Sequence, residues 1–276
     1  MSWRLRIRHI TGFTYAGKAH ASYNEARLTP MTLPWQVTLF SQVEVQPVAP
    51  VYRYYDYWGT LVTSFDLQRA HGELKVVASS LVETDTPPAV SVVDWSAIGE
   101  ASDPHAEMLA QTPRTAVAED LAAQAAAASP GDPLAAGRAI AEFVRSHVDY
   151  VPGSTGVQTS AQEAWTLRKG VCQDIAHLTV GLLRARGLPA RYVSGYLHPQ
   201  REAQVGRTVE GQSHAWVEYW CGDWVGYDPT NGVPVGPQHV VVARGRDYDD
   251  VSPLKGVYHG SPASHLGVTV EITRVT

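Results

Sequence analysis

The sequence predicts an α+β fold, in which a β-rich domain over residues 1–90 precedes a core of helices and strands over residues 91–276. Polar and apolar residues alternate over 3–10 and 37–47, and residues 74–84 are rich in β-branched side chains, which is typical of strands. Residues 56–65 read as two further strands around a turn at Gly59. Composition changes after Thr86-Pro87-Pro88, and from about Asp103 the chain is rich in alanine and favours helix. These observations separate the two regions.

The overall composition excludes several functional classes. The chain has 276 residues, of which 44% are hydrophobic and 18% charged, with a net charge of −5. No long basic run is present, so we expect no nucleic-acid partner. No apolar stretch approaches the roughly 18 residues that cross a bilayer, and the alternating start MSWRLRIRHI does not resemble a secretory leader. Two cysteines are too few for a disulfide framework, so the expected compartment is the cytoplasm.

Helix signals in the second region are specific. Asp132 followed by Pro133 predicts an N-cap and first residue, and Ser160 with Glu163 fits a capping box for a short helix that ends at Leu167. The segment after Gly170 carries apolar residues at helical spacing and ends with arginines and Gly187. It therefore predicts a core helix whose first turn holds Cys172.

The position of Cys172 has a chemical consequence. Backbone N–H groups and the helix dipole place partial positive charge at a helix N-terminus, which favours a thiolate and a developing oxyanion. A buried, inert cysteine is the competing interpretation. A nucleophilic cysteine also needs a base and a group that orients the base.

A hairpin downstream supplies both. His214–Trp220 alternates as a strand, Cys221-Gly222-Asp223 reads as a turn, and Trp224–Asp228 returns. With a three-residue loop, Asp228 is a diagonal neighbour of His214 on one face, about 7 Å away by backbone position. A two-residue loop would place Asn231 opposite His214 instead. We favour Asp228.

Several other residues have plain structural interpretations. His177, five positions after Cys172, is expected to support the site from behind, and Cys221 to be a bystander. The tryptophans of the hairpin more often pack than bind substrate, although Trp216 is kept as a cleft candidate. The spacing of cysteines, histidines and acids matches no metal-ligand pattern, so neither a metal nor another cofactor is expected.

The blocks GVCQDIAHLTVGLLRARGLPARYVSGYL, SHAWVEYW and WVGYDPTN resemble the bacterial transglutaminase-like superfamily, whose core is papain-like. RLTP and YDYWGTLVTSF resemble the N-terminal region of one of its branches, and Gly245–Gly260 resembles a loop of that branch. Unlike animal transglutaminases, the sequence has Gly170-Val171 before Cys172 and no acidic calcium loop. This departure argues against calcium dependence and protein cross-linking.

The resemblance implies a Cys172–His214–Asp228 triad that forms an acyl-enzyme with an amide, released to water or to an amine. Hydrolysis of a peptide or peptide-like amide is the favoured reaction. Oxyanion donors would be the Cys172 N–H and a group near Tyr150 or Gln162. Asp247, Tyr248 and Asp250 would line the cleft mouth. Genes of this branch tend to neighbour ATP-grasp-like ligases, which suggests a functional link. A transferase, a non-catalytic scaffold and a metal protein are the competing hypotheses.

Overall fold

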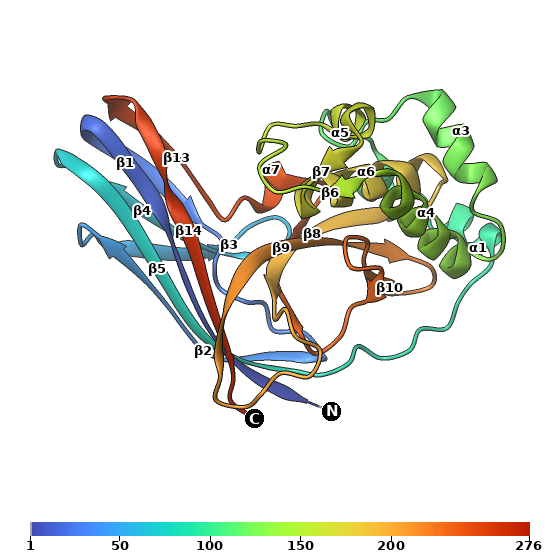
Figure 1. Cartoon of the computed structure of the whole chain (residues 1–276), viewed down its shortest axis with the longest axis horizontal. Coiled ribbons are helices and arrows are strands. Elements are labelled where there is room, and N and C mark those ends of the chain that lie inside the picture. Colours follow the sequence, from blue (N-terminus) through green and yellow to red (C-terminus); the bar gives the residue numbers. More distant parts are fainter. Residues whose placement is uncertain (1) are drawn as a thin grey trace.

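The computed structural model describes residues 2–276, and the side chains of all of these except Gln212 and His265. Five strands occupy the first region: β1 (Trp3–Ala26), β2 (Gln36–Gln46), β3 (Val51–Tyr55), β4 (Leu61–Leu67) and β5 (His71–Thr84). The later strands are β6 (Asp149–Tyr150), β7 (Lys169–Gly170), β8 (Ala190–Leu197), β9 (Thr208–Trp220), β10 (Trp224–Asp228), β11 (Val233–Pro234), β12 (His239–Gly245), β13 (Leu254–Gly260) and β14 (Ala263–Arg274). The predicted β-rich start is confirmed. Figure 1 shows the strands β1, β2, β4 and β5 apart from the helices.

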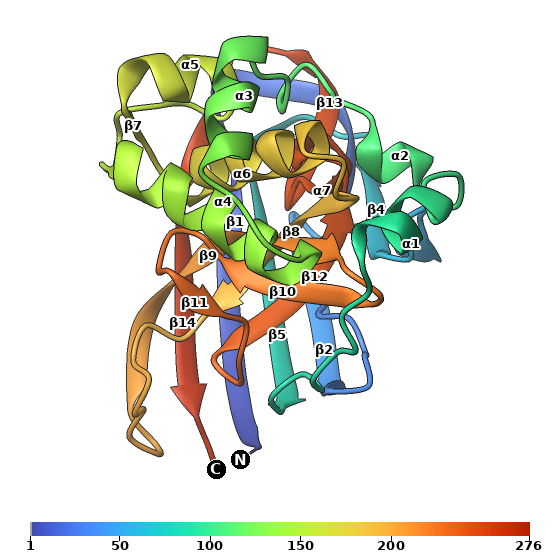
Figure 2. The same ribbon diagram turned by 90° about the vertical axis from the view of Figure 1, so that its right-hand side faces the viewer.

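The helices all follow residue 94. They are α1 (Trp95–Glu100), α2 (Ala106–Leu109), α3 (Glu119–Ala127), α4 (Pro133–His147), α5 (Ala161–Leu167), α6 (Cys172–Ala185) and α7 (Tyr248–Val251). In Figures 1 and 2, α3 to α6 gather on one side of the strands β8 to β10. The predicted α+β class is therefore confirmed. Within the described residues, no helix has both the length and the apolar character needed to cross a membrane.

A continuous sheet links the two regions. Its longest path runs β11-β10-β9-β14-β1-β4-β3, and β5, β8, β12 and β13 join from the side. β14 pairs with β1 through Ile272↔Ile7 and with β9 through Ile272↔Val209. The last strand, β14, therefore borders strands of both regions. The domain boundary at residue 90 stays a prediction.

The predicted helix ends agree with the structure. The Asp132 side chain accepts a hydrogen bond from the Ala135 N–H at the start of α4. Ser160 and Glu163 form the capping box of α5. Helix α6 ends just before Gly187, whose φ of 88° lies in the left-handed region that favours glycine. Local sequence signals therefore set the frame that carries Cys172.

Helix α6 lies at the centre of the main core. Its residues from Asp174 to Arg184 are buried, among them the largest apolar ones, Ile175, Leu178, Leu182 and Leu183. The sequence predicted one apolar face, whereas the structure covers the helix on nearly every side. Gly181 makes this possible, because its Cα faces the Thr115 carbonyl oxygen so closely that a Cβ would overlap it.

We expect Gly181→Ala to lower the free energy of unfolding by about 1–3 kcal/mol, since the overlap with the Thr115 backbone forces two packed segments apart. Gly99→Ala is the matched control: Gly99 is also helical, but nothing lies within 4 Å of the position that the added methyl group would take. Helix propensity predicts that this control is unchanged or up to about 1 kcal/mol more stable. Urea unfolding of the two variants measures the difference, and equal stability would contradict the packing account.

Candidate active site

Cys172 is the first residue of α6, and the segment before it is fixed by local bonds. Tyr150 of β6 pairs with Gly170 of β7 in a short parallel ladder. The Asp174 carboxylate accepts hydrogen bonds from the Val171 N–H at 2.8 Å and from the Thr155 hydroxyl at 2.6 Å. Cys172 itself is only partly buried. Its thiol is therefore presented at the positive end of a buried helix dipole.

The hairpin β9–β10 has the register that the three-residue loop predicts. Trp220 faces Trp224 and Val217 faces Tyr227, so Asp228 follows on the predicted face. His214 Nε2 lies 2.8 Å from Asp228 Oδ2. The structure thus brings Asp228 to His214 as the sequence analysis favoured. Asn231 is close as well, because its Nδ2 lies 3.5 Å from His214 Nε2 and donates to Asp228 Oδ2 at 2.7 Å.

The Asp228 carboxylate is fully buried and accepts hydrogen bonds from several groups. His239 Nε2 lies 3.2 Å from the same Oδ2 atom. The N–H groups of Thr230 and Asn231 donate to Oδ1 at 3.0 and 3.1 Å. Burial alone would raise the pKa of Asp228, but the hydrogen bonds from His214 and His239 outweigh it and hold the pKa far below its usual range. Asp228 is therefore a carboxylate at neutral pH.

His214 lies between that carboxylate and the sulfur of Cys172. Its side chain is 9% exposed, and it hydrogen-bonds with Cys172 as well as with Asp228. Because Nε2 is engaged with Asp228, Nδ1 is the nitrogen that meets the sulfur. Burial lowers the pKa of His214, yet the bonds to Asp228 and Cys172 prevail and raise it to about 10. This environment favours an imidazolium next to the sulfur of Cys172.

His239 is a member of this cluster that the sequence analysis missed. Its Nδ1 accepts from the Gly236 N–H at 3.2 Å, so the proton sits on Nε2 and points to Asp228. Burial lowers the pKa of His239, which keeps the ring neutral. The only available signal was a histidine that opens the apolar strand HVVVA, and that pattern alone does not distinguish a site residue from a core residue.

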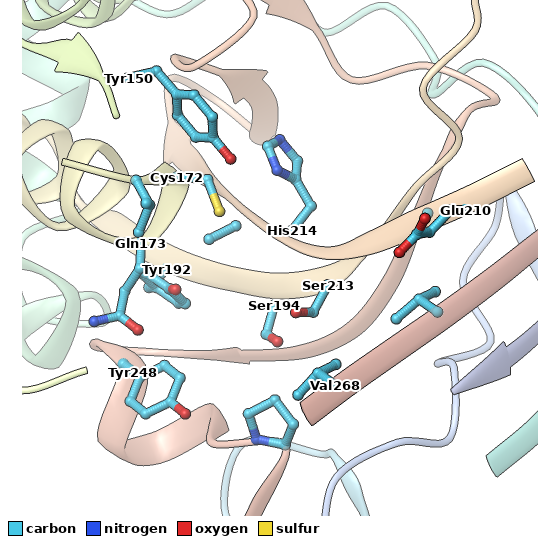
Figure 3. A pocket seen from close by; sticks show the side chains of 15 residues that line it. Tyr150, Cys172, Gln173, Tyr192, Ser194, Glu210, Ser213, His214, Tyr248 and Val268 are labelled. Carbon is cyan, nitrogen blue, oxygen red and sulfur yellow. The ribbon is translucent and has the colours of Figure 1, made fainter. Parts of the chain in front are cut away.

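Two neighbouring cavities share Tyr150, Glu210, Gly211 and His214 in their walls, and Figure 3 shows the first of them, which also includes Cys172. The first, of about 390 Å³, extends along the Cys172 side past Tyr192 and Tyr248 to Val268 and Val270 of β14. The second, of about 360 Å³, extends along the His214 side towards Leu197, Pro199, Thr230 and Asn231. Figure 3 shows the Tyr150 hydroxyl directed towards Cys172 and His214. Together the cavities form a cleft that extends on both sides of His214 and includes the sulfur of Cys172 on one of them.

Of the remaining residues predicted for the site, some line the cleft and others do not. Tyr248 lines the cleft, where the sequence analysis placed it, and Tyr150, the candidate oxyanion donor, lies in the same wall. Gln162 does not: its side-chain oxygen accepts from the Ala118 N–H at the start of α3. Trp216 is also wrong as a cleft residue, because it is fully buried and its ring meets those of His214 and His239.

Asp247 and Asp250 are likewise absent from the cavity walls. Asp247 caps α7 by accepting from the Asp249 N–H, and Asp250 binds Arg246. Both carboxylates are engaged in holding α7 in place, which explains why only their neighbour Tyr248 reaches the cleft. The sequence could not separate these roles, because capping and substrate contact both use acidic residues in loops.

His177 supports the site from behind, as expected. Its fully buried ring accepts a hydrogen bond from the Tyr248 N–H at 3.1 Å and packs on Tyr192. Burial, with a smaller contribution from Arg114, lowers the pKa of His177 to about 3, so the ring is neutral. Among the side chains that the structure describes, no group of three histidines, cysteines or acids is arranged to hold a metal ion.

Comparison with known proteins matches two ranges of the chain to known families. Residues 120–229 match the transglutaminase-like superfamily, and residues 5–83 match the bacterial transglutaminase-like N-terminal region. An uncharacterized protein of Mycobacterium leprae is 49% identical over 277 residues, covering 99% of both chains. An uncharacterized Mycobacterium tuberculosis protein is 32% identical, covering 98% of this chain and 92% of its own.

Two further similarities are more limited. A protein-glutamine gamma-glutamyltransferase of Pseudomonas aeruginosa is 32% identical over 124 residues, 40% of this chain and 18% of its own. The solved structure of a proposed cysteine protease from Cytophaga hutchinsonii superposes with a TM-score of 0.81 at 22% identity, covering 100% of this chain and 92% of that one. The second similarity concerns the fold alone. The resemblance seen in the sequence is confirmed: the chain belongs to the transglutaminase-like superfamily and carries the bacterial transglutaminase-like N-terminal region.

Proposed function

We propose that the protein catalyses cysteine-dependent acyl transfer at an amide, with water as acceptor and a peptide or peptide-like molecule as substrate. One observation carries the proposal: His214 bonds with Cys172 on one side and, at 2.8 Å, with the buried Asp228 carboxylate on the other. This is the arrangement of nucleophile, base and orienting group that acyl transfer requires.

In the proposed reaction the Cys172 thiolate attacks the amide carbonyl carbon. The Cys172 N–H, which belongs to the first helical turn and so lacks an intrahelical acceptor, donates to the developing oxyanion, and the Tyr150 hydroxyl is the second donor. His214 gives its Nδ1 proton to the leaving amine, and a thioester with Cys172 remains. His214 then takes a proton from water, which attacks the thioester and releases a carboxylic acid.

The supporting residues have distinct tasks in this scheme. Asp228 holds the His214 ring by its Nε2 atom and stabilises the imidazolium. Asn231 and His239 fix the carboxylate in turn, because each donates to its Oδ2 atom. The cleft that extends on both sides of His214 suits an amide inside a longer molecule, with the acyl part on one side and the amine part on the other.

Alkylation by iodoacetamide tests the thiolate without a known substrate. We expect Cys172 to react at a pH well below about 8.5, where a free thiol titrates, and His214→Ala to move its midpoint up towards that value. Cys221 is the internal control, since burial first, and then Asp132, raise the pKa of its thiol to about 11. Peptide mapping against pH measures both cysteines. If Cys172 reacts no more readily than Cys221, its side chain has only a packing role and the proposal of an enzyme fails.

Asp228→Asn tests the orienting carboxylate. The raised pKa of His214 depends on Asp228, so its loss lets the imidazolium release its proton at lower pH. We expect the alkylation midpoint of Cys172 to rise part of the way to that of His214→Ala, and amide hydrolysis to fall on the order of 10²-fold. Asp223→Asn is the control, because that exposed carboxylate lies in the turn of the same hairpin. If Asp228→Asn keeps the wild-type dependence of Cys172 alkylation on pH, Asp228 has no role in the proposed mechanism.

Transfer to an amine is the second candidate, favoured by the similarity to the Pseudomonas aeruginosa gamma-glutamyltransferase. The triad chemistry up to the thioester is the same, so only the acceptor separates the two reactions. Product analysis in the presence of a labelled primary amine decides between them. We expect the free acid to predominate; incorporation of the label into most of the product would identify a transferase.

A further inference from the structure

Glu210 is an acidic residue that lines both cavities of the cleft. It lies on β9, four residues before His214 and therefore on the same face of the strand. Its exposed side chain lines both cavities, together with Tyr150, Gly211 and His214. Figure 3 shows the Glu210 carboxylate beyond His214, on the side away from Cys172. A substrate that spans the cleft therefore passes this carboxylate about 13 Å along the strand from His214, by backbone rise.

The cleft carries a net negative charge. Among the described residues that line the two cavities, Glu210 alone carries a formal charge besides Cys172 and His214, and lysine and arginine are absent. Behind them the buried Asp228 adds a negative charge. Asp228 and a Cys172 thiolate would each carry one negative charge, and an imidazolium at His214 would balance one of them. The cleft with Glu210 therefore has a net negative charge.

Among the residues that the structure describes, no cation of the neighbouring strands forms an ion pair with the Glu210 carboxylate. Glu210 pairs across the sheet with Glu271 of β14, which is another carboxylate. The arginine of the next strand, Arg8, pairs with Glu271 and forms an ion pair with it at 3.6 Å. The nearby positive charge is thus directed to Glu271, while the Glu210 side chain faces the cleft.

We propose that Glu210 makes the cleft selective for amide substrates that carry a cationic group, an ammonium or a guanidinium, on the part that extends along β9 beyond His214. The proposal rests on the proposed function in that it concerns the same cleft and the same thiol. A cation would gain attraction from Glu210 and from the net charge of the triad, whereas a substrate carboxylate would meet repulsion from both. Specificity would then arise partly from rejection of acidic substrates.

Charged thiol reagents measure this effect at Cys172 directly. The probes are the trimethylammonioethyl and sulfonatoethyl methanethiosulfonates, which are similar in size and opposite in charge. In each case the Cys172 thiolate attacks the sulfenyl sulfur and methanesulfinate leaves. The ratio of the two rate constants reports the local potential, because both reagents meet the same fraction of thiolate at a given pH and that fraction cancels. The test therefore remains valid even if the proposed function fails.

We expect Glu210→Gln to lower the cation-to-anion rate ratio at Cys172 by about threefold at an ionic strength of about 0.01 M, because one negative charge of the cleft is lost and the Debye length there is about 30 Å. Glu73→Gln, which removes an exposed carboxylate of β5 outside both cavities, should leave the ratio unchanged. High salt should shrink the difference between wild type and Glu210→Gln. If the ratio in Glu210→Gln equals that in Glu73→Gln, Glu210 does not set the potential of the cleft and the proposal is overturned.

Discussion

The buried carboxylate of Asp228 is the interaction on which the site depends. Its two oxygens accept hydrogen bonds from His214, Asn231, His239 and two backbone N–H groups, and the group is fully buried. A buried charge is tolerated only when it is well hydrogen-bonded, so these donors and the carboxylate stabilise one another. The orientation of the His214 ring, and through it the state of Cys172, follows from this arrangement. Removal of a donor would therefore act on chemistry as well as on stability.

The second constraint is the shared sheet. β9 carries Glu210 and His214, pairs with β14 at its start and with β8 and β10 further along. β14 supplies Val268 and Val270 to the cleft and also pairs with β1. The β-rich first region is thereby joined, through one strand, to a wall of the candidate active site. Helix α6 approaches from the other side of the cleft and supplies Cys172, so the site lies where the two halves of the fold meet.

Much of this was accessible from the sequence, and the reason is physical. Helix caps at Asp132 and Ser160, the helix that begins at Cys172 and the β9–β10 hairpin all depend on neighbouring residues, so local patterns predict them. The hairpin register even placed Asp228 beside His214, because pairing across a tight turn is fixed by loop length. Long-range pairing was not accessible: nothing local says that β14 lies between β1 and β9. For the same reason His239 was missed, while Gln162, Trp216, Asp247 and Asp250 were assigned to a cleft that their side chains do not reach.

The central claim is that Cys172 forms an acyl-enzyme which His214 then helps to resolve. Reaction with a simple activated ester such as p-nitrophenyl acetate, followed by rapid quenching, intact mass measurement and peptide mapping, tests it most directly. The account predicts an acetyl group on Cys172 that forms quickly and is lost with time in the wild-type protein, and whose formation is much slower in His214→Ala. Acetylation of Cys172 at the same slow rate in both proteins, or of other residues while Cys172 stays free, would contradict the account.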